Sequence, residues 1–134
     1  MGFYCMIEKS EYLEWIEIAE QDLNSAIFLK SMIPKPIEII CYHCQQSAEK
    51  FLKAFLIKKE IKFIRTHDLT LLYGKCKSYD TDFTNVMKDC VELTEYSVGV
   101  RYPYHIELEI EDVEKAILSA EKIRDLILEK LETN

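Results

Sequence analysis

Apolar residues recur along this chain at steps of three and four residues, the spacing that places side chains on one face of an α-helix. This pattern occurs in five stretches, and no stretch alternates apolar and polar residues as a half-buried strand does. The predicted helices are residues 10–31, 36–59, 66–77, 83–97 and 111–132. The sequence therefore predicts an all-α fold, an antiparallel bundle of four long helices plus one short helix.

Polar residues and prolines mark the ends of these predicted helices. Ser10 and Thr66 are expected to be the N-caps of the first and third helices, because a hydroxyl there accepts a hydrogen bond from a free backbone N–H. Pro34 and Pro36 end the first helix and begin the second. We expect one domain over residues 10–132, preceded by an N-terminal arm over residues 1–9.

Composition narrows the class of protein. Hydrophobic residues make up 49% of the 134 positions and charged residues 31%, which is typical of a globular domain. No apolar run approaches the roughly 20 residues that span a bilayer. The first residues lack the basic region and apolar core of a secretion signal. We therefore expect a cytoplasmic protein with no membrane association.

The five cysteines are an odd number, and without a secretion signal this favours reduced, mostly buried thiols. Cys41 and Cys44 form a CxxC pair, but no second pair accompanies them. Both also fall on the apolar face of the second predicted helix. We interpret them as small core residues and expect neither a metal nor a cofactor.

The net charge of −7 and the pI near 5.0 argue against general nucleic-acid binding, which needs a basic surface. The charge is uneven, however: from Lys50 to Arg65 there are six basic residues and one acidic residue. This basic segment is suited to a nucleotide, a short RNA or an acidic partner. Alternatively, Lys58 and Lys59 offset the dipole at a helix C-terminus and the rest is solvated.

Three strings together resemble the HEPN domains, the "higher eukaryotes and prokaryotes nucleotide-binding" family of small helical bundles. They are Cys-Tyr-His-Cys-Gln-Gln-Ser-Ala-Glu-Lys-Phe-Leu-Lys-Ala at 41–54, Thr-His-Asp-Leu at 66–69 and Arg-Tyr-Pro at 101–103. The resemblance covers residues 10–131. It implies a helical bundle that forms a homodimer, in a family that contains both ribonucleases and non-catalytic partner proteins.

Arg101 and His105 are the candidate catalytic residues. A histidine can move the proton of a 2′-hydroxyl or of the leaving oxygen, and an arginine can hold the scissile phosphate. The resemblance implies an arginine followed after four to six residues by a histidine, in a composite site at the dimer interface. Here three residues separate the two, and one of them is Pro103. The alternative is that Arg101 forms a structural salt bridge at one end of the bundle.

Further residues could bind a nucleotide or its phosphate. His67, Arg65 and Lys62 lie near the N-terminus of the third helix, where free N–H groups suit an anion. The alternative is that His67 packs against the bundle while Asp68 caps the helix. His43 and Lys50, with Gln46, share one face of the second helix, which could instead be a polar edge toward solvent or a dimer partner. Tyr102 and Tyr104, beside Arg101, could stack a base or anchor a protein interface.

The Arg-Tyr-Pro string is similar to that of small HEPN proteins encoded beside minimal nucleotidyltransferases. This resemblance implies a nucleotide- or nucleic-acid-associated accessory partner of a minimal nucleotidyltransferase, in a toxin–antitoxin or stress-type module. The first alternative is a metal-independent endoribonuclease that uses Arg101 and His105. The second alternative is a purely structural dimerisation module.

Overall fold

The computed structural model describes residues 2–61, 65–96 and 107–133. Within these ranges, side chains are described for residues 11 to 132. Its elements are α1 (Gly2–Leu29), α2 (Ile37–Lys58), α3 (Leu69–Tyr79), a 3-10 helix η1 (Thr81–Val86), α4 (Met87–Thr94) and α5 (Ile110–Thr133). These ranges contain no strand. The predicted all-α bundle is confirmed.

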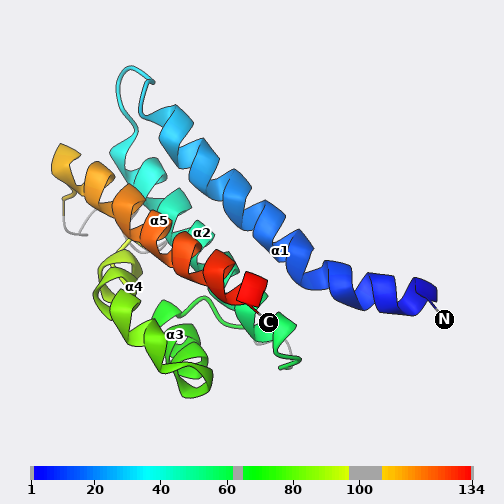
Figure 1. Ribbon diagram of the computed structural model, residues 1–134. Coiled ribbons are helices and arrows are strands. Elements are labelled where there is room, and N and C mark those ends of the chain that lie inside the picture. The colour runs from blue at the N-terminus through cyan, green and yellow to red at the C-terminus, as the bar shows by residue number, and fades with distance from the viewer. Residues whose placement is uncertain (1, 62–64, 97–106, 134) are drawn as a thin grey trace.

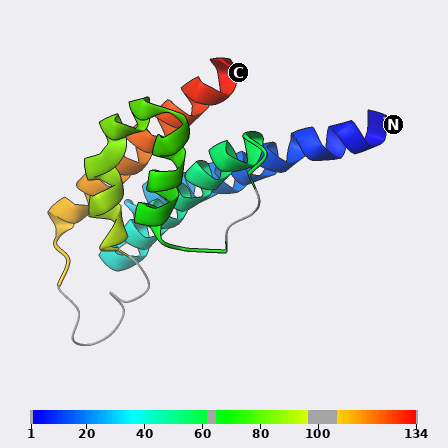
Figure 2. The same cartoon turned by 90° about the horizontal axis from the view of Figure 1, so that it is seen from below.

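The second helix, α2, lies at the centre of the bundle. Helices α1 and α5 run beside it. Helix α3 packs against α2 and α4, and α4 packs against α2 and α5, away from α1 (Figures 1 and 2). The first turns of α1 project beyond the other helices (Figure 1). None of the helices in the described ranges is both long enough and apolar enough to cross a membrane.

The predicted apolar stripe of α2 forms the middle of the core. Its fully buried members are Ile40, Cys41, Cys44, Ala48, Phe51 and Leu52. The Ser47 hydroxyl donates to the carbonyl of Ala19 at 2.8 Å, and both residues are completely buried. Small side chains at this crossing let the backbones of α1 and α2 approach closely.

Two predicted N-caps are wrong. Helix α1 begins at Gly2, so Ser10 lies inside it. Helix α3 begins at Leu69 and its N-cap is Asp68, whose carboxylate accepts from the backbone N–H groups of Thr70 at 2.9 Å and Leu71 at 3.3 Å. A carboxylate satisfies both the free donors and the positive end of the helix dipole, which a hydroxyl cannot do.

The predicted fourth helix is divided. Residues 81–86 form η1, and α4 follows from Met87 to Thr94. The buried pair Phe83 and Val86 explains the error, because a spacing of three residues fits a 3-10 helix as well as an α-helix. Phe83 packs on Phe55 of α2, with the ring centroids 4.8 Å apart. Helix α5 agrees with its predicted range to within one residue.

Replacing Gly74 by alanine should stabilise the protein. Gly74 lies inside α3 on the exposed side, and a Cβ built there meets nothing within 4 Å. Alanine restricts the unfolded chain without a clash, so the free energy of unfolding should rise by about 0.5–1 kcal/mol. Urea unfolding followed by circular dichroism measures this difference. A loss of stability would show that α3 is not packed as described.

The buried thiols should be unreactive in the folded protein. Burial raises the pKa of the Cys41 and Cys90 thiols to about 12 and also raises those of Cys44 and Cys76. Because the thiolate is the reactive form, Ellman's reagent at pH 8 should label none of these four in a Cys5→Ser background. All four should react in denaturant. Fast labelling of any of them under native conditions would contradict the described core.

Candidate functional site

A band of polar side chains crosses the surface of α2, from α1 on one side to the segment before α3 on the other. We call it the polar strip. It consists of Asp22, His43, Gln45, Gln46, Glu49, Lys50, Lys53 and His67. Each member is hydrogen-bonded to another member, and the bonds form two groups: Asp22 with His43 and Lys50, and Glu49 with Lys53, His67, Gln45 and Gln46.

At the α1 end of the strip, one carboxylate holds two side chains of α2. Asp22 Oδ1 lies 3.1 Å from Nδ1 of His43, and Asp22 Oδ2 accepts from Lys50 Nζ at 2.6 Å. Asp22 and Lys50 are largely buried, and His43 is partly exposed. His43 and Lys50 are seven residues apart, which places them on the same face of α2. Asp22 therefore fixes both side chains against α1.

At the other end, the carboxylate of Glu49 is almost completely buried, with 2% of the side chain exposed. It accepts from Lys53 Nζ at 2.9 Å and from Nδ1 of His67 at 3.0 Å. The ammonium of Lys53 lies 5.5 Å from the centroid of the Trp15 ring, which closes the site on the α1 side. A buried carboxylate needs such partners, because an unpaired charge in the core is very unfavourable.

Two glutamines of α2 belong to the His67 end of the strip. Gln46 donates from Nε2 to Oε1 of Gln45 at 2.8 Å, and Gln45 donates to the backbone carbonyl of His67 at 3.5 Å. The second bond ties the segment before α3 to α2. His67 is held both through its backbone and through its ring.

Both histidines of the strip have the same geometry. A carboxylate can only accept, so the Nδ1 of His43 and of His67 must carry the proton, and Nε2 is left for another partner. The side chain of His67 is 83% exposed. In the neutral ring Nε2 accepts a hydrogen bond, and in the protonated ring it donates one. Each ring can therefore bind a ligand in a fixed orientation.

The HEPN domain family model matches residues 12–131. The chain belongs to the HEPN domain family. Comparisons with curated proteins and with solved structures found no match. Membership places this HEPN protein in a nucleic-acid-related family whose domains commonly dimerise.

The predicted anion site at the N-terminus of α3 lacks the free backbone N–H groups on which the prediction for this HEPN protein relied. Asp68 occupies the free N–H groups that a phosphate would need. Arg65 and His67 remain exposed, and only their side chains are left to meet an anion. Lys62 lies outside the described residues.

The basic segment from Lys50 to Arg65 is less available than its composition indicates. Lys50 is bound to Asp22 and Lys53 is buried against Glu49. Lys58 donates to the carbonyl of Leu131 and lies 5.0 Å from the centroid of the Tyr12 ring. Lys59 and Arg65 are the exposed basic residues in the described part of this segment.

The predicted catalytic residues Arg101 and His105, with Tyr102 and Tyr104, lie outside the described residues. The chain enters that segment after Tyr96, which is buried and whose hydroxyl donates to Asp112 at 3.4 Å. Within the described ranges, no group of three His, Cys, Asp or Glu side chains is placed to hold a metal ion.

Sequence reasoning missed the two carboxylates that organise the strip. Asp22 follows Ala19 by three residues and therefore borders the apolar stripe of α1. Glu49 and Lys53 are an i,i+4 pair at the edge of the apolar stripe of α2. Their position beside an apolar stripe is the signal that could have identified these carboxylates. A charged side chain at the edge of a stripe is partly buried when helices pack, and it then needs a partner.

The buried pair gives a prediction about stability. Lys53→Met leaves the carboxylate of Glu49 buried without its ammonium partner, so it should lower the free energy of unfolding by about 3 kcal/mol. The double variant Glu49→Gln/Lys53→Met buries no charge at this position and should recover most of that loss. Denaturant unfolding of the single and double variants measures both effects. Additive losses in the double variant would contradict the pairing.

Proposed function

We propose that this HEPN protein is a nucleic-acid-associated accessory partner of a minimal nucleotidyltransferase, and that it binds the phosphate groups of RNA or of a nucleotide through His67 and Arg65. The accessory role follows from the similarity of its Arg-Tyr-Pro string to HEPN proteins of that kind. Family membership supports the association with nucleic acid. In this role the chain works in a toxin–antitoxin or stress-type module.

The observation that carries the phosphate site is the setting of His67. Its ring is 83% exposed, yet its Nδ1 is fixed by the buried carboxylate of Glu49. Fixing an exposed ring in one orientation has an entropic cost, so such a bond adds little to stability. Its main effect is to set the orientation of the ring. The fixed ring presents Nε2 outward, where the protonated form donates to a phosphate oxygen.

Arg65 supports the same interpretation. It is exposed, lies two residues before His67 and follows the residues that end α2. A guanidinium binds phosphate with two parallel N–H groups, which complements the single donor of an imidazole. Asp68 next to them is already occupied by the α3 backbone, which lessens its repulsion of an anion.

Fluorescence anisotropy with a short single-stranded RNA tests this site. Arg65→Ala and His67→Ala should each weaken binding by roughly tenfold, the loss expected when one charge-assisted hydrogen bond is removed. Each should also reduce the slope of log Kd against log salt by about 0.7, as for one phosphate contact on a single strand. The matched control is Lys77→Ala, which removes one exposed positive charge from α3.

Equal effects of Lys77→Ala and Arg65→Ala would contradict a defined phosphate site. The accessory role has its own test, which is formation of a complex of fixed stoichiometry with a separately encoded minimal nucleotidyltransferase. Metal-independent cleavage of the RNA in EDTA, abolished by His105→Ala, would replace the accessory role by the endoribonuclease alternative. Absence of both RNA binding and a complex would favour the purely structural dimerisation module.

A further inference from the structure

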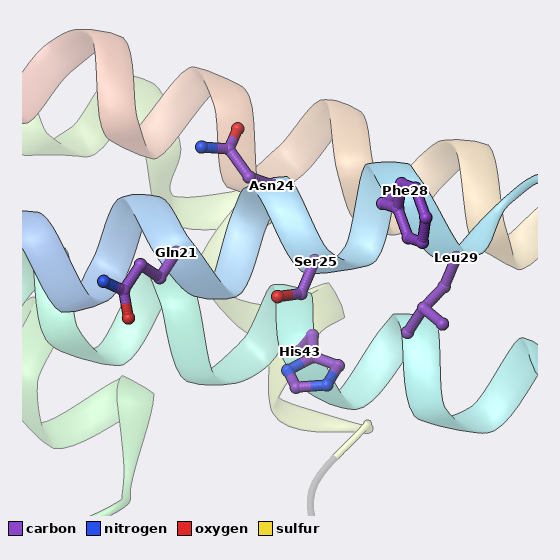
Figure 3. A pocket seen from close by; sticks show the side chains of 6 residues that line it. All are labelled: Gln21, Asn24, Ser25, Phe28, Leu29 and His43. Carbon is purple, nitrogen blue, oxygen red and sulfur yellow. The ribbon is translucent and has the colours of Figure 1, made fainter.

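A shallow depression of about 590 Å³ lies between α1 and α2 beside His43 (Figure 3). It is lined by Gln21, Asn24, Ser25, Phe28 and Leu29 of α1 and by His43 of α2. Its volume falls in the range of sites that hold small organic molecules. The last four α1 residues lie three, four, seven and eight positions after Gln21, so the five form one stripe of the helix.

The stripe is unusual for an exposed helix face because it carries no charge. The solvent side of the preceding turns has Glu11, Glu14 and Glu17, whereas no charged residue occurs between Asp22 and Lys30. No lysine or arginine lines the depression. Its chemistry therefore suits a neutral polar ligand and does not suit a phosphate group.

Phe28 gives the depression an aromatic surface. Its side chain is 77% exposed, although it is one of the largest apolar groups on α1. Figure 3 shows the ring over the α1 ribbon, above Leu29, whose side chain points toward α2. Aromatic rings exposed in this way stack on planar bases in single-strand binding proteins, and stacking tolerates any base. A ligand with a planar heteroaromatic ring could stack on Phe28 and also shield Leu29 from water.

The polar groups of the depression then determine which ring fits. Ser25 points toward His43, whereas Asn24 points away from it at the rim (Figure 3). The bond from Nδ1 of His43 to Asp22 leaves Nε2 of the neutral ring as an acceptor. The amide of Gln21 supplies both a donor and an acceptor. A ligand that donates from an amino group and also accepts satisfies all three side chains.

We propose that this depression binds a nucleobase with an exocyclic amino group, with adenine as the best match. Phe28 stacks on the base, Nε2 of His43 accepts from the amino group, and Gln21 and Ser25 bond the remaining ring edge. Glutamine and asparagine amides pair with the donor–acceptor edge of adenine in the same way. The inference rests on the proposed function, because it assigns base recognition to α1 and phosphate binding to His67 and Arg65.

Titration with adenosine, which has no phosphate, tests the base site separately. Changes in the ¹H–¹⁵N amide spectrum should saturate and should centre on residues 21–29 and 43. Phe28→Ala should weaken adenosine binding at least about tenfold, the loss expected for one stacking ring, and Phe28→Tyr should retain it. Leu13→Ala is the matched control, since Leu13 is an exposed apolar residue of the same helix outside the depression. Uridine, which lacks the amino group, should bind more weakly than adenosine.

Three outcomes would overturn the base site. The first is the absence of a saturable change with adenosine, and the second is an equal effect of Phe28→Ala and Leu13→Ala. The third is that Phe28→Ala dissociates a dimer, as measured by light scattering, in a protein that binds no nucleoside. The two proposals fail separately: Arg65→Ala should leave adenosine affinity unchanged while it weakens RNA binding. Adenosine binding in a protein that binds no RNA would support the base site and contradict the phosphate site.

Discussion

The enclosure of α2 is the constraint on which the rest of the structure depends. More than half of its residues are buried, and they include Gln45, Ser47, Glu49 and Lys53 as well as the apolar stripe. Helices α1, α3, α4 and α5 all pack against it. A helix covered on so many sides cannot leave its polar side chains to water, so each must find a partner within the protein.

Those partners form the candidate site. Glu49 reaches His67 because the segment before α3 passes over α2, and Asp22 reaches His43 and Lys50 because α1 approaches closely at Ser47. The same bonds that satisfy buried groups therefore fix two histidine rings at the surface. Buried ion pairs contribute little net stability compared with apolar packing, although removing one partner of such a pair is strongly destabilising.

Much of the fold could be predicted from the sequence, because long helices with one buried face repeat their apolar residues at a fixed spacing. The buried residues of α2, α3 and α5 recur at the three- and four-residue steps from which these helices were predicted. The errors occur where local chemistry competes: Asp68 displaces Thr66 as a cap, and the spacing of Phe83 and Val86 does not distinguish a 3-10 helix from an α-helix. Periodicity contains no information about such choices.

The site could be predicted only in part, for a different reason. His43, His67 and Lys50 are chemically conspicuous, but the carboxylate partner of each lies on a different element from its own. Which side chains pair across elements depends on how the helices pack, and the packing of helices cannot be read from the spacing of residues in one sequence. The exposed stripe that ends at Phe28 left a weak signal, which is the absence of charge between Asp22 and Lys30.

The distribution of charge also decides how an acidic chain could bind nucleic acid. The net charge is −7, and Lys50, Lys53 and Lys58 are engaged within the fold. A net negative charge and the engagement of these three lysines both weaken non-specific electrostatic attraction to a phosphate backbone. Stacking and hydrogen bonding to bases would then have to add to the few phosphate contacts. An uncharged stripe with an exposed ring is the surface that such a mode of binding requires.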